Sequence, residues 1–190
     1  MRNQGFLAAG LLLLALAGPA GVAQAGTHPQ NHNGWSIGLG LGGGTAGLSV
    51  DGAPSSDREG GSLGSFRLGY PLNEKVSLAM ESNLWTKEQD GVSVTFNAVT
   101  AGVAFFPSEG LVLRGGIGFG GTTLTVKSPY GTLTNSESGL GLNGSVGYEF
   151  RLACTFALGP QLEAGYAKFD GGSSNWFGGS LALNWYFVKK

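Results

Sequence analysis

The chain has 190 residues, of which 36 are glycine and only 12% are charged, and its formal net charge is −1. No basic patch stands out, which excludes electrostatic recognition of nucleic acid. The single cysteine, Cys154, excludes an internal disulfide and a cysteine-rich metal site, and we expect it to be a small structural residue.

The N-terminus is typical of a secretory signal peptide. Arg2 provides the basic region, residues 6–17 form an apolar core, and Ala23-Gln24-Ala25 is a small-x-small cleavage site. The core is shorter than the roughly 20 residues that a spanning helix needs. Gly26, not cysteine, follows the cleavage site, which argues against a lipoprotein anchor. We therefore expect three segments: a signal peptide at residues 1–25, a polar lead-in at residues 26–34 and one barrel domain at residues 35–190.

Beyond the lead-in, apolar and polar residues alternate with a period of two, which predicts β-strands. The last strand shows this best, because Phe177, Leu181, Leu183, Trp185 and Phe187 share one face. In chain order the predicted strands are residues 35–42, 65–70, 76–81, 92–106, 111–119, 140–150, 156–166 and 175–187.

The connections between these strands alternate in length. Three are tight, at residues 71–75, 107–110 and 152–155. The others are predicted to be longer, polar loops, at residues 51–60, 86–91, 122–137 and 167–174. Tight turns at one end and longer loops at the other are typical of outer-membrane barrels, whereas a soluble β-sandwich has no reason to sort its loops in this way. The sequence therefore predicts an all-β fold, an eight-stranded antiparallel up-and-down transmembrane β-barrel with both termini on the periplasmic side.

Several segments resemble those of small eight-stranded outer-membrane proteins, the OmpA-like, OmpX-like and OmpW-like β-barrel superfamily. They are residues 97–107 (NAVTAGVAFFP), 111–119 (LVLRGGIGF), 139–150 (GLGLNGSVGYEF) and the closing strand. The resemblance covers residues 35–187 and is specific for architecture rather than for one member. It implies a place in the outer membrane of a Gram-negative-type envelope, contact with outer-membrane lipid, and insertion by the barrel-assembly machinery through the C-terminal strand.

The sequence departs from this family in two ways. Residues 188–190 follow the aromatic residue on which such chains usually end, and we expect no peptidoglycan-binding domain of the kind that full-length OmpA-type proteins carry.

Five charged residues within the strands occupy the face opposite the apolar residues: Arg67, Glu81, Arg114, Glu149 and Glu163. A cation that faces lipid near the bilayer midplane costs about 2–4 kcal/mol, so we expect these side chains in the lumen. The lumen of an eight-stranded barrel is just wide enough for side chains to fill it, and buried charges should pair. Two interpretations stay open. The charges form a structural plug, or inward glycines such as Gly38 and Gly40 leave water-filled space for a gated polar conduit.

Aromatic residues cluster near the predicted strand ends, which indicates girdles at the two membrane interfaces. They are Trp35, Tyr70, Trp85, Phe106, Tyr148, Phe150, Phe156, Tyr166, Trp176, Trp185 and Phe187. A platform for stacking nucleic-acid bases would need basic residues between them, and these are missing.

No catalytic, cofactor or metal site is predicted. His28 and His32 are the only histidines, and both precede the first strand. Outer-membrane deacylases, palmitoyl transferases and omptin proteases use histidine as a base, and we expect no histidine where the barrel could present one. Two histidines four residues apart make a weak metal site. No Lys-Ser/Thr pair follows the glycines, as a phosphate loop would require.

Three functions fit the sequence. The first is an integral outer-membrane barrel with a structural or surface-interaction role and an unknown extracellular partner. The second is a small pore or OmpW-like conduit for small or apolar solutes. The third is a secreted soluble barrel that binds a ligand, although the outward apolar residues argue against it.

Overall fold

The computed structural model describes residues 32, 34–52 and 57–188, so the predicted signal peptide and most of the lead-in lie outside the described residues. Within those ranges, no helix is long and apolar enough to cross a membrane. The described chain forms these strands: β1 (Gly34–Val50), β2 (Glu59–Pro71), β3 (Val76–Gln89), β4 (Val92–Phe105), β5 (Leu111–Ser128), β6 (Gly131–Tyr148), β7 (Phe150–Ala153), β8 (Phe156–Phe169) and β9 (Gly172–Val188).

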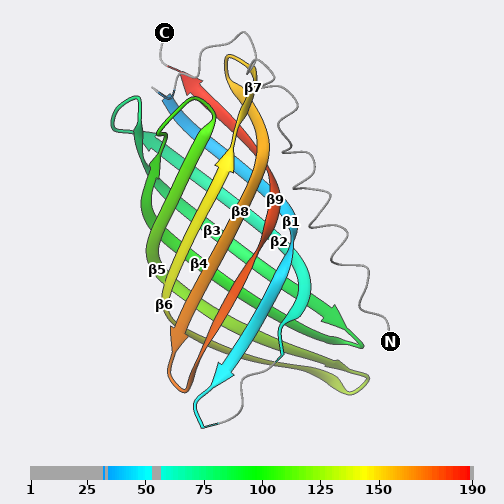
Figure 1. Cartoon of the computed structure of the whole chain (residues 1–190). Helices are drawn as coiled ribbons and strands as arrows, with labels where there is room; N and C mark the ends of the chain where they lie inside the picture. The colour runs from blue at the N-terminus through cyan, green and yellow to red at the C-terminus, as the bar shows by residue number, and fades with distance from the viewer. Residues whose placement is uncertain (1–31, 33, 53–56, 189–190) are drawn as a thin grey trace.

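The strands form one closed antiparallel barrel (Figure 1). Neighbours in the chain pair from β1 to β6, and β1 also pairs with β9. β9 pairs with β8, and β8 pairs with β6 to complete the ring. The short β7 continues β6 beyond Glu149 and pairs with β8 through a shift in register. The barrel wall therefore has eight strands, of which the sixth is interrupted, and the predicted eight-stranded antiparallel barrel is confirmed.

Alternate residues of each strand face the outside and the lumen, as the period of two predicts. On β8, for example, Leu162 is 63% exposed while its neighbour Glu163 is 5% exposed. The outer surface carries Leu, Ile, Val, Met and aromatic side chains on every long strand. An outer wall with a band of exposed apolar side chains on every long strand needs lipid around it, whereas a soluble barrel is polar outside.

The connections differ from the prediction at one end of the barrel. Residues 72–75, 106–110 and 154–155 are short turns, at the places where the tight turns 71–75, 107–110 and 152–155 were predicted. At the other end, three of the four predicted loops are mostly strand, because β3 to β6, β8 and β9 extend until only two residues separate each pair of strands. Asp90 and Gly91 both have positive φ (52° and 78°), which is the conformation of a two-residue type I′ hairpin turn.

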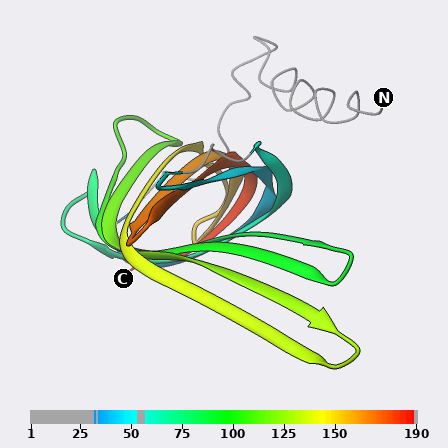
Figure 2. The same ribbon diagram turned by 90° about the horizontal axis from the view of Figure 1, so that it is seen from below.

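The extended strands form two hairpins, β3–β4 and β5–β6, that leave the barrel on one side (Figure 2). Residues 86–91 and 122–137 of these hairpins were predicted as loops, whereas residues 92–106, which include β4, were predicted as a strand. In residues 122–137 the apolar alternation stops while the pairing of β5 with β6 continues. In β6, residues 131–138 are all exposed.

The loop end of the lumen is filled by an apolar layer, which we call the tryptophan layer: Ala46, Leu63, Trp85, Phe96, Ala98 and Trp176. Trp85 and Trp176 are 1% and 2% exposed, and the Trp85 ring stacks on Phe96 with 5.3 Å between centroids. The prediction that these two tryptophans belong to an interfacial girdle is therefore wrong. Phe106 is likewise buried, at the turn end of the barrel.

Candidate functional site: the polar network of the lumen

Below the tryptophan layer the lumen holds a network of charged and polar side chains, and Arg114 of β5 lies at its centre. Its Nη2 is 2.8 Å from Oε1 of Glu149, and its Nη1 donates to Oε1 of Gln161 at 3.0 Å. Its Nε lies 3.8 Å from Oε1 of Glu81. Arg114 therefore links β3, β8 and the break between β6 and β7.

Arg67 of β2 extends the network around the wall. It lies directly opposite Glu81 in the β2–β3 register, with its Nε 3.6 Å from Glu81 Oε1. Its Nη2 is 3.8 Å from Oε2 of Glu163 on β8 and donates to Ser65 Oγ at 2.7 Å. Glu81 thus lies between two arginines, and the structure places all five charged residues of the predicted cluster together in the lumen.

Neutral side chains complete the network, and the sequence reasoning did not single them out. Tyr186 donates its hydroxyl to Glu149 Oε2, and Asn184 donates to Glu149 Oε1 at 3.1 Å. Asn143 donates to Oε2 of Glu81. They share the inward face with the charged residues, so the period of two was the signal that could have found them.

Arg151 of β7 is the charged residue that sequence reasoning missed. It is 1% exposed, its guanidinium lies 4.0 Å from the centroid of the Tyr186 ring, and its Nη1 donates to the carbonyl of Cys154 at 3.4 Å. Cys154 itself is exposed in the turn after β7. With Arg151 included, three arginines face three glutamates, so the network has no formal net charge.

Two of the inward glycines, Gly38 and Gly40, make room for neighbouring side chains. A Cβ on Gly38 would lie 2.3 Å from Asn184 Oδ1, and one on Gly40 would lie 2.3 Å from Ser65 Oγ. The cavity beside Arg67 has a volume of about 20 Å³, which is room for about one water molecule.

His32 occupies the turn end of the lumen, so the prediction that no histidine lies where the barrel could present one is wrong. Its ring stacks on Phe106 with 3.7 Å between centroids and meets Tyr186 edge-on at 5.2 Å, and it is 4% exposed. Burial lowers the pKa of His32 from 6.5 to about 4; the Glu149 charge opposes this change and the Arg151 charge adds to it. Neutral His32 therefore packs as an aromatic ring over the network. His28 lies outside the described residues.

This pKa predicts a pH dependence of stability. Because folding lowers the pKa of His32, the unfolded chain binds more protons than the folded chain between pH 6.5 and 4. The free energy of unfolding therefore decreases as the pH is lowered through that window. The contribution of neutral His32 should be complete above about pH 6.5 and lost as the pH falls through about 4. We expect His32→Phe, which keeps the stacked ring but cannot titrate, to reduce the difference between urea midpoints at pH 7 and pH 4. Proton NMR should give a His32 titration midpoint near 4, and a midpoint near 6.5 would contradict the packing described here.

No group of three or more histidine, cysteine, aspartate or glutamate side chains is placed to hold a metal ion in residues 32, 34–52 and 57–188. The carboxylates of the lumen are engaged by arginines, amides and a tyrosine hydroxyl. The arrangement can therefore hold the wall together electrostatically, and it offers little space to a ligand.

Comparison with known proteins supports the same architecture. The chain is similar to Ail, the attachment invasion locus protein of Yersinia pestis, with 19% identity and a TM-score of 0.57 over 82% of this chain and 99% of that one. It is also similar to Neisserial surface protein A, with 13% identity and a TM-score of 0.57 over 80% of this chain and 97% of that one. At these identities the likeness shows the fold alone.

No curated protein matches the sequence. The family model described as the outer membrane protein beta-barrel domain matches residues 9–185, which is most of the chain. The chain belongs to the family of the outer membrane protein beta-barrel domain.

Proposed function

We propose that this protein is an integral outer-membrane barrel without catalytic activity, with a structural or surface-interaction role. It is exported through its signal peptide and inserted by the barrel-assembly machinery through its C-terminal strand. The observation that carries the proposal is the filling of the lumen at three successive levels. They are His32 with Phe106, the charged network, and the tryptophan layer.

The filled lumen favours this role over that of a conduit. A solute would have to displace Trp85 and Trp176, which are both almost fully buried, and then pass arginine–glutamate pairs with a neighbouring cavity of about 20 Å³. Breaking a buried ion pair costs about 3–5 kcal/mol, so such a passage requires rearrangement of the core rather than the opening of a gate.

The position of His32 supports the absence of histidine-dependent catalysis. A serine nucleophile needs a base within hydrogen-bond reach. His32 is buried between Phe106 and Tyr186, and its Nε2 has no hydrogen-bond partner among the described residues.

The β5–β6 hairpin is the part of the molecule best suited to a partner. Among the described strands, β6 pairs only with β5 between Gly131 and Gly139, because its pairing with β8 begins at Leu140. A strand with a free edge offers unpaired backbone groups to an extended segment of another protein. Leu124, Leu133 and Tyr130 add exposed apolar surface beside this edge.

A trimmed hairpin tests the surface role. Thr122 and Glu137 are paired in register, so a two-residue Asn-Gly turn can replace residues 123–136 and keep the strands aligned. We expect the trimmed protein to fold, seen as heat-modifiable migration on SDS gels, because the lumen is untouched. We expect cells that display the full chain to aggregate or to adhere to protein-coated surfaces, and cells that display the trimmed protein to lose this behaviour.

Two measurements make this test decisive. Lys127→Ala changes the hairpin surface without removing the edge and should leave adhesion unchanged. In planar bilayers, neither the full chain nor the trimmed chain should show single-channel conductance. If the trimmed protein keeps its adhesion, or if both forms conduct equally, a conduit should replace the role proposed here.

A further inference from the structure

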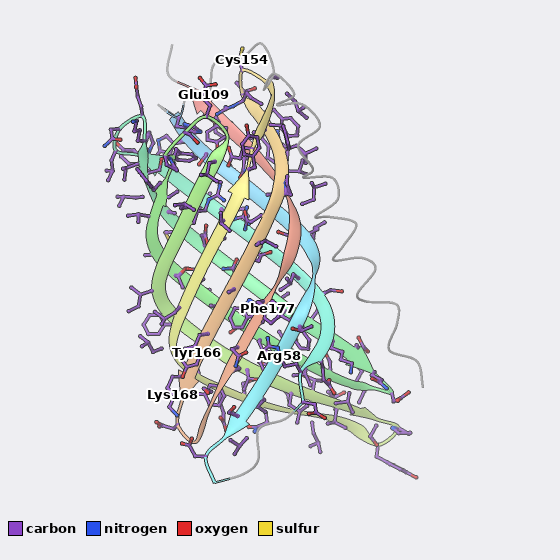
Figure 3. The ribbon with its side chains drawn as sticks, viewed as in Figure 1. Arg58, Glu109, Cys154, Tyr166, Lys168 and Phe177 are labelled. Carbon is purple, nitrogen blue, oxygen red and sulfur yellow. The ribbon has the colours of Figure 1, made fainter. Side chains whose placement is uncertain are left out.

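The outer wall of the barrel changes from apolar to polar along a line that crosses β1, β8 and β9. On β9 the outward residues from Phe187 to Phe177 are apolar or glycine, and Asn175 follows them. That span matches the roughly 9–11 residues that a tilted strand needs to cross a membrane. On β8 the same change falls between Tyr166 and Lys168, close to Phe177 and Arg58 in Figure 3. Lipid headgroups of the loop-side leaflet should lie at this level.

The Arg58 side chain lies along the outer wall at this boundary between apolar and polar residues. Its Nε donates to Thr45 Oγ1 at 3.1 Å and its Nη2 donates to the Thr45 carbonyl at 2.9 Å. Its Nη1 donates to Asn175 Oδ1, and its Cζ lies 4.6 Å from the centroid of the Phe177 ring. The guanidinium is therefore fixed in position although the side chain is exposed.

These contacts leave part of Arg58 unused. A guanidinium has five N–H donors, so one N–H on each terminal nitrogen remains after the three hydrogen bonds above. Thr45 and Asn175 are neutral, and none of the ion pairs of the described residues includes Arg58. The guanidinium of Arg58 is thus held in one position at the level of the lipid headgroups, without a carboxylate to balance its charge among the described residues. Its two remaining N–H donors match the geometry of a phosphate group.

Lys168 supplies a second cation on the neighbouring strand. Asn175, which accepts from Arg58, pairs with Tyr166, and Lys168 is the next outward residue of β8. Its Nζ lies 3.6 Å from Asp51 Oδ2, with both side chains at least half exposed, and such an ion pair contributes little. Lys168 can exchange this partner for a stronger anion.

We propose that Arg58 and Lys168 form a binding site for the phosphate of an anionic lipid in the loop-side leaflet, with Phe177 and Tyr166 against its apolar portion. The site faces the bilayer, so a lipid, not a soluble anion, is its ligand. The remaining cations at this end differ, because Lys87 and Lys127 lie on the hairpins, each 2.9 Å from a glutamate.

The test measures lipid retention by the refolded protein. Protein exchanged from nanodiscs of phosphatidylcholine with a small fraction of bisphosphorylated lipid A is examined by native mass spectrometry. We expect the wild type to retain lipid A, and Arg58→Gln/Lys168→Gln to retain about tenfold less, since a charge-assisted hydrogen bond contributes at least the 1.4 kcal/mol that corresponds to a factor of ten. The matched control Lys87→Gln/Lys127→Gln removes the same charge from the hairpins and should retain lipid as the wild type does.

Three results would overturn the proposal. The first is that Arg58→Gln/Lys168→Gln retains as much lipid A as the wild type does. The second is that the wild type retains lipid A without its phosphates as well as it retains the bisphosphorylated form. The third is that millimolar inorganic phosphate displaces lipid A, which would indicate that the ligand is a soluble anion. Folding of each variant is checked by heat-modifiable migration. If the double variant does not fold, Thr45→Val decides the question. It removes the Oγ1 acceptor that orients Arg58 without changing charge, and it should weaken retention of the phosphorylated lipid.

Discussion

Replacement of Arg114 by alanine should lower the free energy of unfolding by about 3–5 kcal/mol. The Arg114 side chain is 6% exposed and contacts Glu81, Glu149 and Gln161. Its removal leaves two buried carboxylates with less compensating charge and takes away the contact that joins three parts of the wall. Urea unfolding of the protein in lipid vesicles, followed by tryptophan fluorescence, measures the effect.

Lys127→Ala is the control, since it also removes one cation from β5. Lys127 bridges Glu88 at 2.9 Å with both side chains more than half exposed, and a pair of this kind contributes about 0–1 kcal/mol. Equal losses for Arg114→Ala and Lys127→Ala would mean that Arg114 does not lie in a low-dielectric lumen. A second variant, Arg114→Lys, keeps the charge but not the fork of donors, and it should recover only part of the lost stability.

The period of two carried most of what could be predicted from the sequence. It assigned Arg67, Glu81 and Glu163 to one face, because lipid on the other side of the wall imposes strict alternation. The strand register that places Arg67 opposite Glu81 is seen only in the folded structure. The particular partners of each arginine depend on strand stagger around the closed barrel, which no local pattern encodes.

The errors had different physical causes. Trp85 and Trp176 share the inward parity of Glu81 and Ser180, so the alternation places them in the lumen. Their position near the predicted strand ends indicates a girdle instead, and proximity to a strand end is a weaker signal than the alternation. Residues 122–137 could not be recognised as strands, because beyond the membrane neither face has to be apolar. His32 stacks on residues distant in sequence, and a polar segment before the first strand carries no sign of such packing.

Replacement of Trp176 by alanine should also cost about 3–5 kcal/mol, because the buried indole leaves a cavity that the closed barrel wall cannot collapse to fill. Phe119→Ala is the matched control, since this aromatic residue of β5 faces outward and is 79% exposed, so that lipid can take its place. We expect a clearly smaller loss there, measured by the same urea unfolding in lipid vesicles.

A glycine beneath Trp176 gives an independent test of the tryptophan layer. A Cβ on Gly165 would lie 2.1 Å from Cζ2 of Trp176, whereas a Cβ on the outward Gly115 would meet nothing closer than 3.8 Å. Gly165→Ala should therefore displace the indole and destabilise the barrel by about 1–3 kcal/mol, the usual cost of overpacking, while Gly115→Ala should be nearly neutral. If Trp176→Ala and Gly165→Ala both unfold like the wild type, the loop end of the lumen is not packed around Trp176. The strongest argument against a conduit would then be lost, because the passage would be closed by the charged network alone.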